Sequence, residues 1–167
     1  KRGKIEEFNR LLLGQEDTTF AVKAGDTCVI ARCRYVITLD ADTQLPPDSA
    51  RRLVGTISHP LNRPRCDPRV GRVTEGYAVL QPRVEISLPS ASRSWFAQVM
   101  SGHVGWDPYT TAASDVYQDL FHEGSYVGKG IYEPRAFHAA LRGRVPDNTL
   151  LSHDLFEGFF ARAGLVA

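Results

Sequence analysis

Residues 34–43 read Arg-Tyr-Val-Ile-Thr-Leu-Asp-Ala-Asp-Thr and decide the fold class. The run from Tyr35 to Leu39 is short, apolar and rich in β-branched and aromatic side chains, which predicts a buried strand. Asp40 and Asp42 follow at once, and residues two apart in an extended segment point the same way. Ligands of α/β sheets bind outside the carboxyl ends of the strands. The stretch therefore predicts two carboxylates at the edge of an α/β sheet.

The acidic pair allows two interpretations. Two carboxylates held close together repel each other unless a proton or a cation intervenes. Mg²⁺ and Mn²⁺ prefer oxygen ligands and often bridge carboxylates to the phosphates of a substrate, which predicts a metal–diphosphate site at Asp40 and Asp42. The other interpretation is structural, because Asp-Ala-Asp-Thr followed by proline is also good turn chemistry. The apolar strand that ends on Asp40 favours the functional interpretation.

The rest of the chain alternates loosely between helical and strand patterns, as in a layered α/β fold. Helices are predicted at residues 4–13, 46–58, 91–100, 112–122, 134–143 and 153–162, strands at 34–40, 72–88 and 124–132, and loops at 59–71 and 101–111.

The composition is that of a soluble domain. The 167 residues are 43% hydrophobic and 23% charged, with a formal net charge of +1, so nucleic acid is not an expected partner. The three cysteines have no metal-binding spacing, which predicts free thiols in a reducing compartment. The chain starts within a helical pattern and stops without a cap, so we expect a piece of a longer protein.

A strand followed by Asp-x-Asp-x-Thr is also typical of haloacid-dehalogenase-type phosphatases. In that enzyme class Asp40 would be the nucleophile and Asp42 the acid/base. Such a phosphatase needs a later lysine and a later acidic pair for Mg²⁺. Lys129 is the one lysine after Lys23, and no convincing acidic pair follows it.

Longer strings carry a more specific signal. The chain resembles the glycosyltransferase domain of cyclic β-1,2-glucan synthases (glycosyltransferase family 84), which are similar to processive family 2-type enzymes. The stretches that carry the resemblance cover most of the chain: residues 1–12, 35–60, 71–95, 107–132 and 150–162. The specific strings are YVITLDADTQLP, RRLVGTISHPLN, LQPRVEISLPSASRSWFA, SDVYQDLFHEGSYVGKGIY and LLSHDLFEG. The resemblance implies a GT-A-like, Rossmann-related fold, with an incomplete, mixed, mainly parallel sheet flanked by helices.

The resemblance also implies an activity. It is the metal-dependent transfer of glucose from UDP-glucose to a growing β-1,2-glucan with inversion, using Mg²⁺ or Mn²⁺. The implied partners are UDP-glucose, the glucan acceptor and the rest of a parent synthase with transmembrane helices. The parent would lie in the bacterial inner membrane with this soluble segment on the cytoplasmic face. A segment that only binds glucan is a non-catalytic alternative.

Individual residues take roles from the same resemblance. Asp40 and Asp42 match the metal and sugar-nucleotide motif, with Asp42 as the direct ligand, and Asp154 matches the catalytic base. Lys4 and Asn9 match a helix near the nucleotide, although Lys4 fits an ordinary surface lysine equally well. Asp154 is also well placed as the first residue of a helix, where the dipole favours a carboxylate.

A further group is expected on the acceptor side. It comprises Gly124, Ser125, Gly128 and Lys129, together with Trp106 and Tyr109 of a loop that could act as a gate. The glycines also have a structural interpretation, since they permit a tight strand or turn. Tyr126 is a candidate for stacking on sugars, whereas Trp95 lies on an apolar helical face and is expected in the core.

Two departures from the family pattern concern the nucleotide site. Family 2-type enzymes begin with a nucleotide-binding strand that carries its own aspartate. They finish with a Gln-x-x-Arg-Trp motif after the helix of the base. Neither feature is present, so we expect this chain alone to bind UDP weakly.

Overall fold

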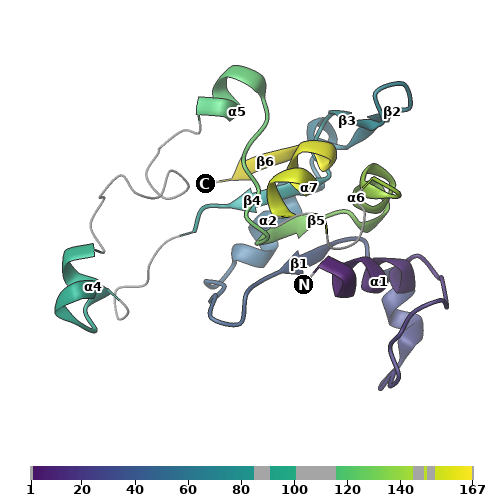
Figure 1. Cartoon of the computed structure of the whole chain (residues 1–167), viewed down its shortest axis with the longest axis horizontal. Coiled ribbons are helices and arrows are strands. Elements are labelled where there is room, and N and C mark those ends of the chain that lie inside the picture. The colour runs from purple at the N-terminus through teal and green to yellow at the C-terminus, as the bar shows by residue number, and fades with distance from the viewer. Residues whose placement is uncertain (1, 85–90, 101–115, 145–148, 150–152, 167) are drawn as a thin grey trace.

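The computed structural model describes residues 2–84, 91–100, 116–144, 149 and 153–166. A four-stranded sheet lies at its centre and helices cover both faces (Figure 1). The helices are α1 (Arg2–Leu12), α2 (Ser49–Ile57), α4 (Trp95–Met100), α5 (Val116–Phe121), α6 (Pro134–Leu141) and α7 (Asp154–Ala161), with 3₁₀ turns η1 (Thr27–Arg32) and η2 (Pro60–Asn62). The strands are β1 (Val36–Thr38), β2 (Arg65–Asp67), β3 (Arg72–Glu75), β4 (Val79–Pro82), β5 (Gly130–Tyr132) and β6 (Ala163–Val166).

The order of strands in the sheet is β1-β5-β4-β6, and β2 and β3 form a separate antiparallel pair. Strand β5 is antiparallel to both of its neighbours, whereas β4 and β6 are parallel. It follows that β1, β4 and β6 run in the same direction. Their carboxyl ends therefore meet at one edge of the sheet, together with the beginning of β5.

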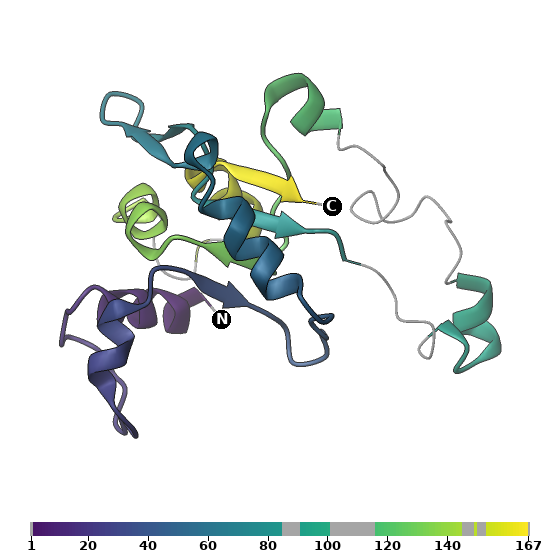
Figure 2. The same ribbon diagram turned by 180° about the vertical axis from the view of Figure 1, so that it is seen from behind.

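The period-two alternation of the strands divides the core into two layers. One layer packs under α1, α6 and α7 and includes Val79 and Tyr132. The other packs under α2 and includes Leu80 and Ile131. Figure 1 shows α7 over the near face of the sheet, and Figure 2 shows α2 crossing the opposite face.

The structure confirms the mixed α/β architecture but not the expected mainly parallel pairing. Two of the three neighbouring strand pairs are antiparallel, because the reversed strand β5 is inserted between β1 and β4. The predicted strand 124–132 shortens to β5, since residues 124–129 form the segment that leads into it. The short strands β2 and β6 were not predicted.

Trp95 is a further correction, because its side chain is 85% exposed rather than in the core. Phe96 and Val99 of the same helix, α4, are exposed as well, so the apolar face of this helix is not packed against the described part of the chain. Among the described residues, no helix has the length and apolar character needed to cross a membrane.

Candidate functional site

One edge of the sheet gathers segments that are far apart in the sequence. Asp40 follows the last residues of β1, Lys129 immediately precedes β5, and Asp154 is the first residue of α7. The register accounts for the first pairing: Thr38 of β1 lies opposite Gly130 of β5, so the residues beyond Thr38 meet those before Gly130. The predicted placement of the acidic motif at a sheet edge is therefore seen in the structure.

Asp40 and Lys129 form an ion pair at this edge. The distance from Lys129 Nζ to Asp40 Oδ2 is 2.9 Å, and the two side chains are 23% and 34% exposed for Lys129 and Asp40, respectively. Thr38 supports the same pairing, because its hydroxyl donates to the Gly130 carbonyl oxygen over 3.3 Å. Lys129, which was predicted to lie on the acceptor side, thus contacts Asp40, which was predicted to bind the metal.

Asp154 lies against the loop that carries Lys129. Gly128 has φ of +78°, and a Cβ added there would stand 2.8 Å and 2.9 Å from the two carboxylate oxygens of Asp154. Both the backbone conformation and the close approach therefore require glycine at this position. The chain of contacts Asp40–Lys129–Gly128–Asp154 brings the acidic motif and the expected base to one site.

Tyr126 is a member of this site that the sequence interpretation placed wrongly. Its side chain is 3% exposed, so its ring cannot stack on a sugar at the surface. Its hydroxyl lies 3.4 Å from Thr38 Oγ1. Burial raises the pKa of Tyr126 to about 12; the Thr38 contact opposes this rise, and the negative charges of Glu157, Asp154 and Asp40 add to it. The hydroxyl therefore stays neutral among carboxylates.

Residues 40–43 form a turn rather than an extended segment. The Thr43 N–H donates to the Asp40 carbonyl oxygen over 3.0 Å, and Asp42 is exposed at the tip. The alternation argument that places both carboxylates on one side does not apply to such a turn. Of the two interpretations of this motif, the structure shows the turn, and the turn lies at the sheet edge.

The residues at this edge fit a divalent cation only in part. Asp42 offers an exposed carboxylate, which is the hard oxygen ligand that Mg²⁺ or Mn²⁺ prefers. The Asp40 carboxylate already forms an ion pair with the Lys129 ammonium. Within the described ranges, no three His, Cys, Asp or Glu side chains come together as a metal site. A cation held here would thus depend on Asp42 and on oxygen atoms of a substrate.

The segment before β5 is fastened by hydrogen bonds to the neighbouring strands. The Gly124 N–H donates to the Ala163 carbonyl oxygen over 2.7 Å, and the Val127 N–H donates to Gln81 Oε1 over 3.0 Å. Gln118 bonds the backbone of Leu165 on β6 through both its amide nitrogen and its amide oxygen. Gly124 thus packs on β6, in line with its structural interpretation, and Gln81 is a positioning residue that the sequence interpretation missed.

Asn9 lies away from the Asp40 edge. It is buried, and its Oδ1 accepts a hydrogen bond of 2.8 Å from the Tyr132 hydroxyl. Tyr132 pairs with Val36, at the other end of the β1–β5 ladder from Thr38.

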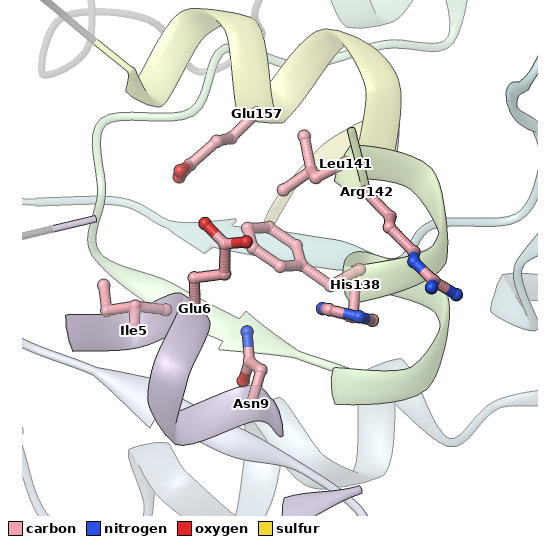
Figure 3. Close-up of a pocket in the computed structure, with 8 residues that line it drawn as sticks. Ile5, Glu6, Asn9, His138, Leu141, Arg142 and Glu157 are labelled. Atoms are coloured by element: carbon pink, nitrogen blue, oxygen red, sulfur yellow. The ribbon is translucent and has the colours of Figure 1, made fainter. Parts of the chain in front are cut away.

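Asn9 also lines a small pocket between α1, α6 and α7 (Figure 3). The pocket holds about 20 Å³, which is room for one water molecule and not for a nucleotide. Figure 3 shows Glu6, Asn9 and Glu157 around this space, with His138 on α6 and Arg142 directly after that helix. Burial lowers the pKa of His138, and the nearby Glu6 charge opposes that shift.

The remaining predicted residues are placed as follows. Lys4 is exposed on α1, and Ser125 is half-buried in the segment before β5. Trp106 and Tyr109 lie outside the described residues. Cys28, Cys33 and Cys66 are free thiols, as predicted, and all three are exposed.

The chain has close similarity to a curated protein. It is 48% identical over 167 residues to the cyclic beta-(1,2)-glucan synthase NdvB of Rhizobium meliloti (strain 1021). The alignment covers 99% of this chain and 6% of that synthase, so the chain spans a small part of its relative's length. No family model matches the chain.

Proposed function

We propose that this chain is the part of a glycosyltransferase that holds the catalytic base and the metal-binding aspartate, in a synthase that builds β-1,2-glucan from UDP-glucose. The observation that carries the proposal is the meeting of Asp40, Lys129 and Asp154 at one sheet edge. The identity of 48% to a cyclic beta-(1,2)-glucan synthase supports glycosyl transfer as the chemistry.

Asp154 is proposed as the general base of an inverting displacement. Its carboxylate takes the proton of an acceptor hydroxyl while that oxygen forms a bond to the anomeric carbon of the donor. The bond between that carbon and the diphosphate oxygen breaks on the opposite side, and the diphosphate leaves with the electron pair. The first turn of α7 suits this role, because the helix dipole favours the ionised carboxylate.

The diphosphate leaves with negative charge that must be compensated. Asp42 would hold Mg²⁺ or Mn²⁺, and the cation supplies Lewis-acid stabilisation of the leaving group. The exposed position of Asp42 in a turn supports this assignment, since a cation shared with substrate phosphates needs an accessible ligand.

Other residues are proposed around the two substrates. Lys4 would face the nucleotide, and Asn9 would act on it indirectly, since the Asn9 side chain is buried against Tyr132. The glucan acceptor would pass along the segment before β5, which includes Ser125. Trp106 and Tyr109 are proposed as gate residues on the acceptor side. The parent synthase would work at the cytoplasmic face of a bacterial inner membrane.

The test of this function is donor-dependent glucan synthesis. The full-length protein is supplied with UDP-glucose labelled in the glucose, with Mn²⁺ or Mg²⁺, and the polymer is analysed for label and linkage. We expect labelled β-1,2-glucan and a requirement for the divalent cation. Consumption of UDP-glucose without labelled polymer would contradict the proposal.

One observation favours a second candidate. A phosphatase of the haloacid-dehalogenase type requires a lysine beside its nucleophilic aspartate, and Lys129 stands 2.9 Å from Asp40. In that candidate, Asp40 would attack phosphorus and form an aspartyl-phosphate. Beryllofluoride, which mimics such an intermediate, would then be trapped at Asp40. We expect no adduct there, because Asp40 is not a nucleophile in glycosyl transfer.

A further inference from the structure

The two aspartates of the acidic motif have different surroundings, because Asp40 forms an ion pair with Lys129 whereas Asp42 is exposed. We propose that Asp40 is a positioning residue that binds Lys129 and so holds the Gly128 backbone under Asp154, and that Asp42 is the member of the pair left for a divalent cation. The roles of Asp154 and Asp42 rest on the proposed function; the role of Asp40 rests on the contacts described above.

The negative charge of Asp40 is compensated by Lys129. An ammonium group 2.9 Å from Oδ2 donates a strong, charge-assisted hydrogen bond and compensates the carboxylate. The side chains of Lys129 and Asp40 are partly buried, at 23% and 34% exposure, so water screens the pair less than it would on an open surface. A divalent cation on the same carboxylate would meet the repulsion of a lysine that is already in place.

The ion pair lies where the pairing of β1 with β5 ends. Thr38 faces Gly130 in the last matched register of β1 and β5, and the Thr38 hydroxyl bonds the Gly130 carbonyl oxygen. The Asp40–Lys129 contact lies just beyond that register. It therefore continues the strand pairing through side chains at the point where the backbone ladder ends.

The ion pair also lies next to the backbone that contacts Asp154. Lys129 is joined directly to Gly128, and the Asp154 carboxylate lies so close to the Gly128 backbone that an added Cβ would clash with it. Release of Lys129 from Asp40 would free this backbone to move, and a displacement of about 1 Å at a reacting group can cost ~10²-fold in rate. Asp40 thus acts on the side of the site that holds Asp154.

The first experiment measures the ion pair without metal or activity. The amines of the full-length protein are labelled competitively with acetic anhydride, and the Lys129 peptide is compared with the exposed Lys23 peptide by mass spectrometry. We expect Asp40→Asn to raise Lys129 labelling several-fold relative to Lys23. The matched change Asp42→Asn, two residues away, should leave that ratio unchanged. Equal effects of the two variants, or none from Asp40→Asn, would overturn the proposal.

The second experiment separates positioning from metal ligation. Mn²⁺ alone is titrated by electron paramagnetic resonance, and we expect Asp42→Asn to weaken its binding by roughly 10-fold or more, with little change for Asp40→Asn. Equal losses in the two variants would make Asp40 a ligand and refute the inference. If wild type binds no Mn²⁺, the metal assignment of the proposed function fails, whereas the labelling result still decides the role of Asp40.

Kinetics supply a readout that general destabilisation would not mimic. Asp40→Asn and Lys129→Met should each lower kcat with little change in KM for the donor, and the double variant should be no slower than either single one. Lys129→Arg, which keeps the charge, should restore most of kcat. Additive losses, or a main effect on the donor KM, would contradict a shared positioning role. If Asp40→Asn does not fold, Lys129→Met provides the same kinetic and Mn²⁺ comparisons.

Discussion

Two segments meet at the same edge of the sheet and are held very differently. The acidic turn at residues 40–43 is closed by the backbone hydrogen bond from Thr43 to Asp40, and Asp42 is exposed at its tip. The segment at residues 124–130 is fastened to β6 by Gly124, to β4 through Gln81 and to α7 through the contact of Gly128 with Asp154. The Asp40–Lys129 ion pair joins the two segments.

The difference matches the two tasks that we assign to the edge. A general base works best when its position is fixed before the reaction, because no reorganisation is then needed at the transition state. A ligand for a cation that arrives with substrate phosphates must instead remain accessible. We therefore expect changes at Asp42, the exposed tip of the open turn, to remove function without altering the fold, and changes in the fastened segment to affect both.

The largest effect is expected in the open turn. Asp42→Ala should abolish metal-dependent glucose transfer by the full-length protein, because the leaving diphosphate loses its counter-charge. The unfolding midpoint of the chain should stay unchanged, since the side chain is exposed. Glu16→Ala removes another exposed acidic side chain and should keep full activity. Normal transfer by the Asp42 variant would refute its role as a ligand.

The next effect tests the fastened segment at its contact with the base. Gly128→Ala should lower transfer by about 10²-fold, because the methyl group displaces the Asp154 carboxylate. Gly14→Ala is the matched control: Gly14 also has a positive φ, of +82°, but nothing lies within 4 Å of an added Cβ. Both variants introduce backbone strain, so a similar loss of activity in the two would show that strain alone is responsible.

A smaller effect is expected where the segment is tied to β4. Gln81→Leu leaves the part-buried Val127 N–H without its acceptor; a fully buried unsatisfied donor costs about 1–3 kcal/mol, so we expect about 1 kcal/mol here. Urea unfolding of this chain should show that loss in free energy of unfolding. Gln44→Leu, at an exposed position, should show almost none. Equal stability of the Gln81 and Gln44 variants would mean that the hydrogen bond between Val127 and Gln81 does not stabilise the segment.

The smallest effect is a dependence of stability on alkaline pH. Burial raises the pKa of Tyr126 from 10.0 to about 12, so between these values the unfolded chain loses this proton before the folded chain does. The stability contributed by the neutral hydroxyl is therefore complete below pH 10 and falls as the pH rises toward 12. At pH 11 the expected loss is about 1 kcal/mol.

Tyr126→Phe removes this group from the titration. Urea unfolding at pH 9 and pH 11 should show a smaller loss of stability in the variant than in wild type. An identical loss in both proteins would mean that the Tyr126 hydroxyl titrates normally, and that the site around it is more open than the contacts indicate.

The positions of β1 and of the start of α7 could be predicted from the sequence. The apolar run that ends at Asp40 indicates β1, because a short β-branched and aromatic stretch before a turn is typical of a buried strand. The start of α7 at Asp154 follows from the apolar spacing after it. Both signals are local, so they identify the two ends of the site.

The contacts between those ends could not be predicted in this way. The pairing of Asp40 with Lys129 depends on the reversed direction of β5, and strand direction is set by tertiary packing rather than by local pattern. The short strand β6 carries Ala163 and Gly164, which have weak strand propensity, so its position comes from packing against β4. The burial of Tyr126 likewise follows from α7 lying over it, where Gly158 of that helix approaches the Tyr126 Cβ.

We propose that the fastened segment holds Asp154 as the base of glucosyl transfer, and Asp154→Asn tests this role most directly. The amide keeps the shape of the carboxylate but cannot take a proton, and loss of a general base costs ~10²–10⁴-fold in rate. UDP-glucose binding and labelled glucan synthesis are measured side by side on the full-length wild type and variant. We expect the variant to bind the donor as wild type does and to make almost no glucan. Glucan synthesis at the wild-type rate would contradict it.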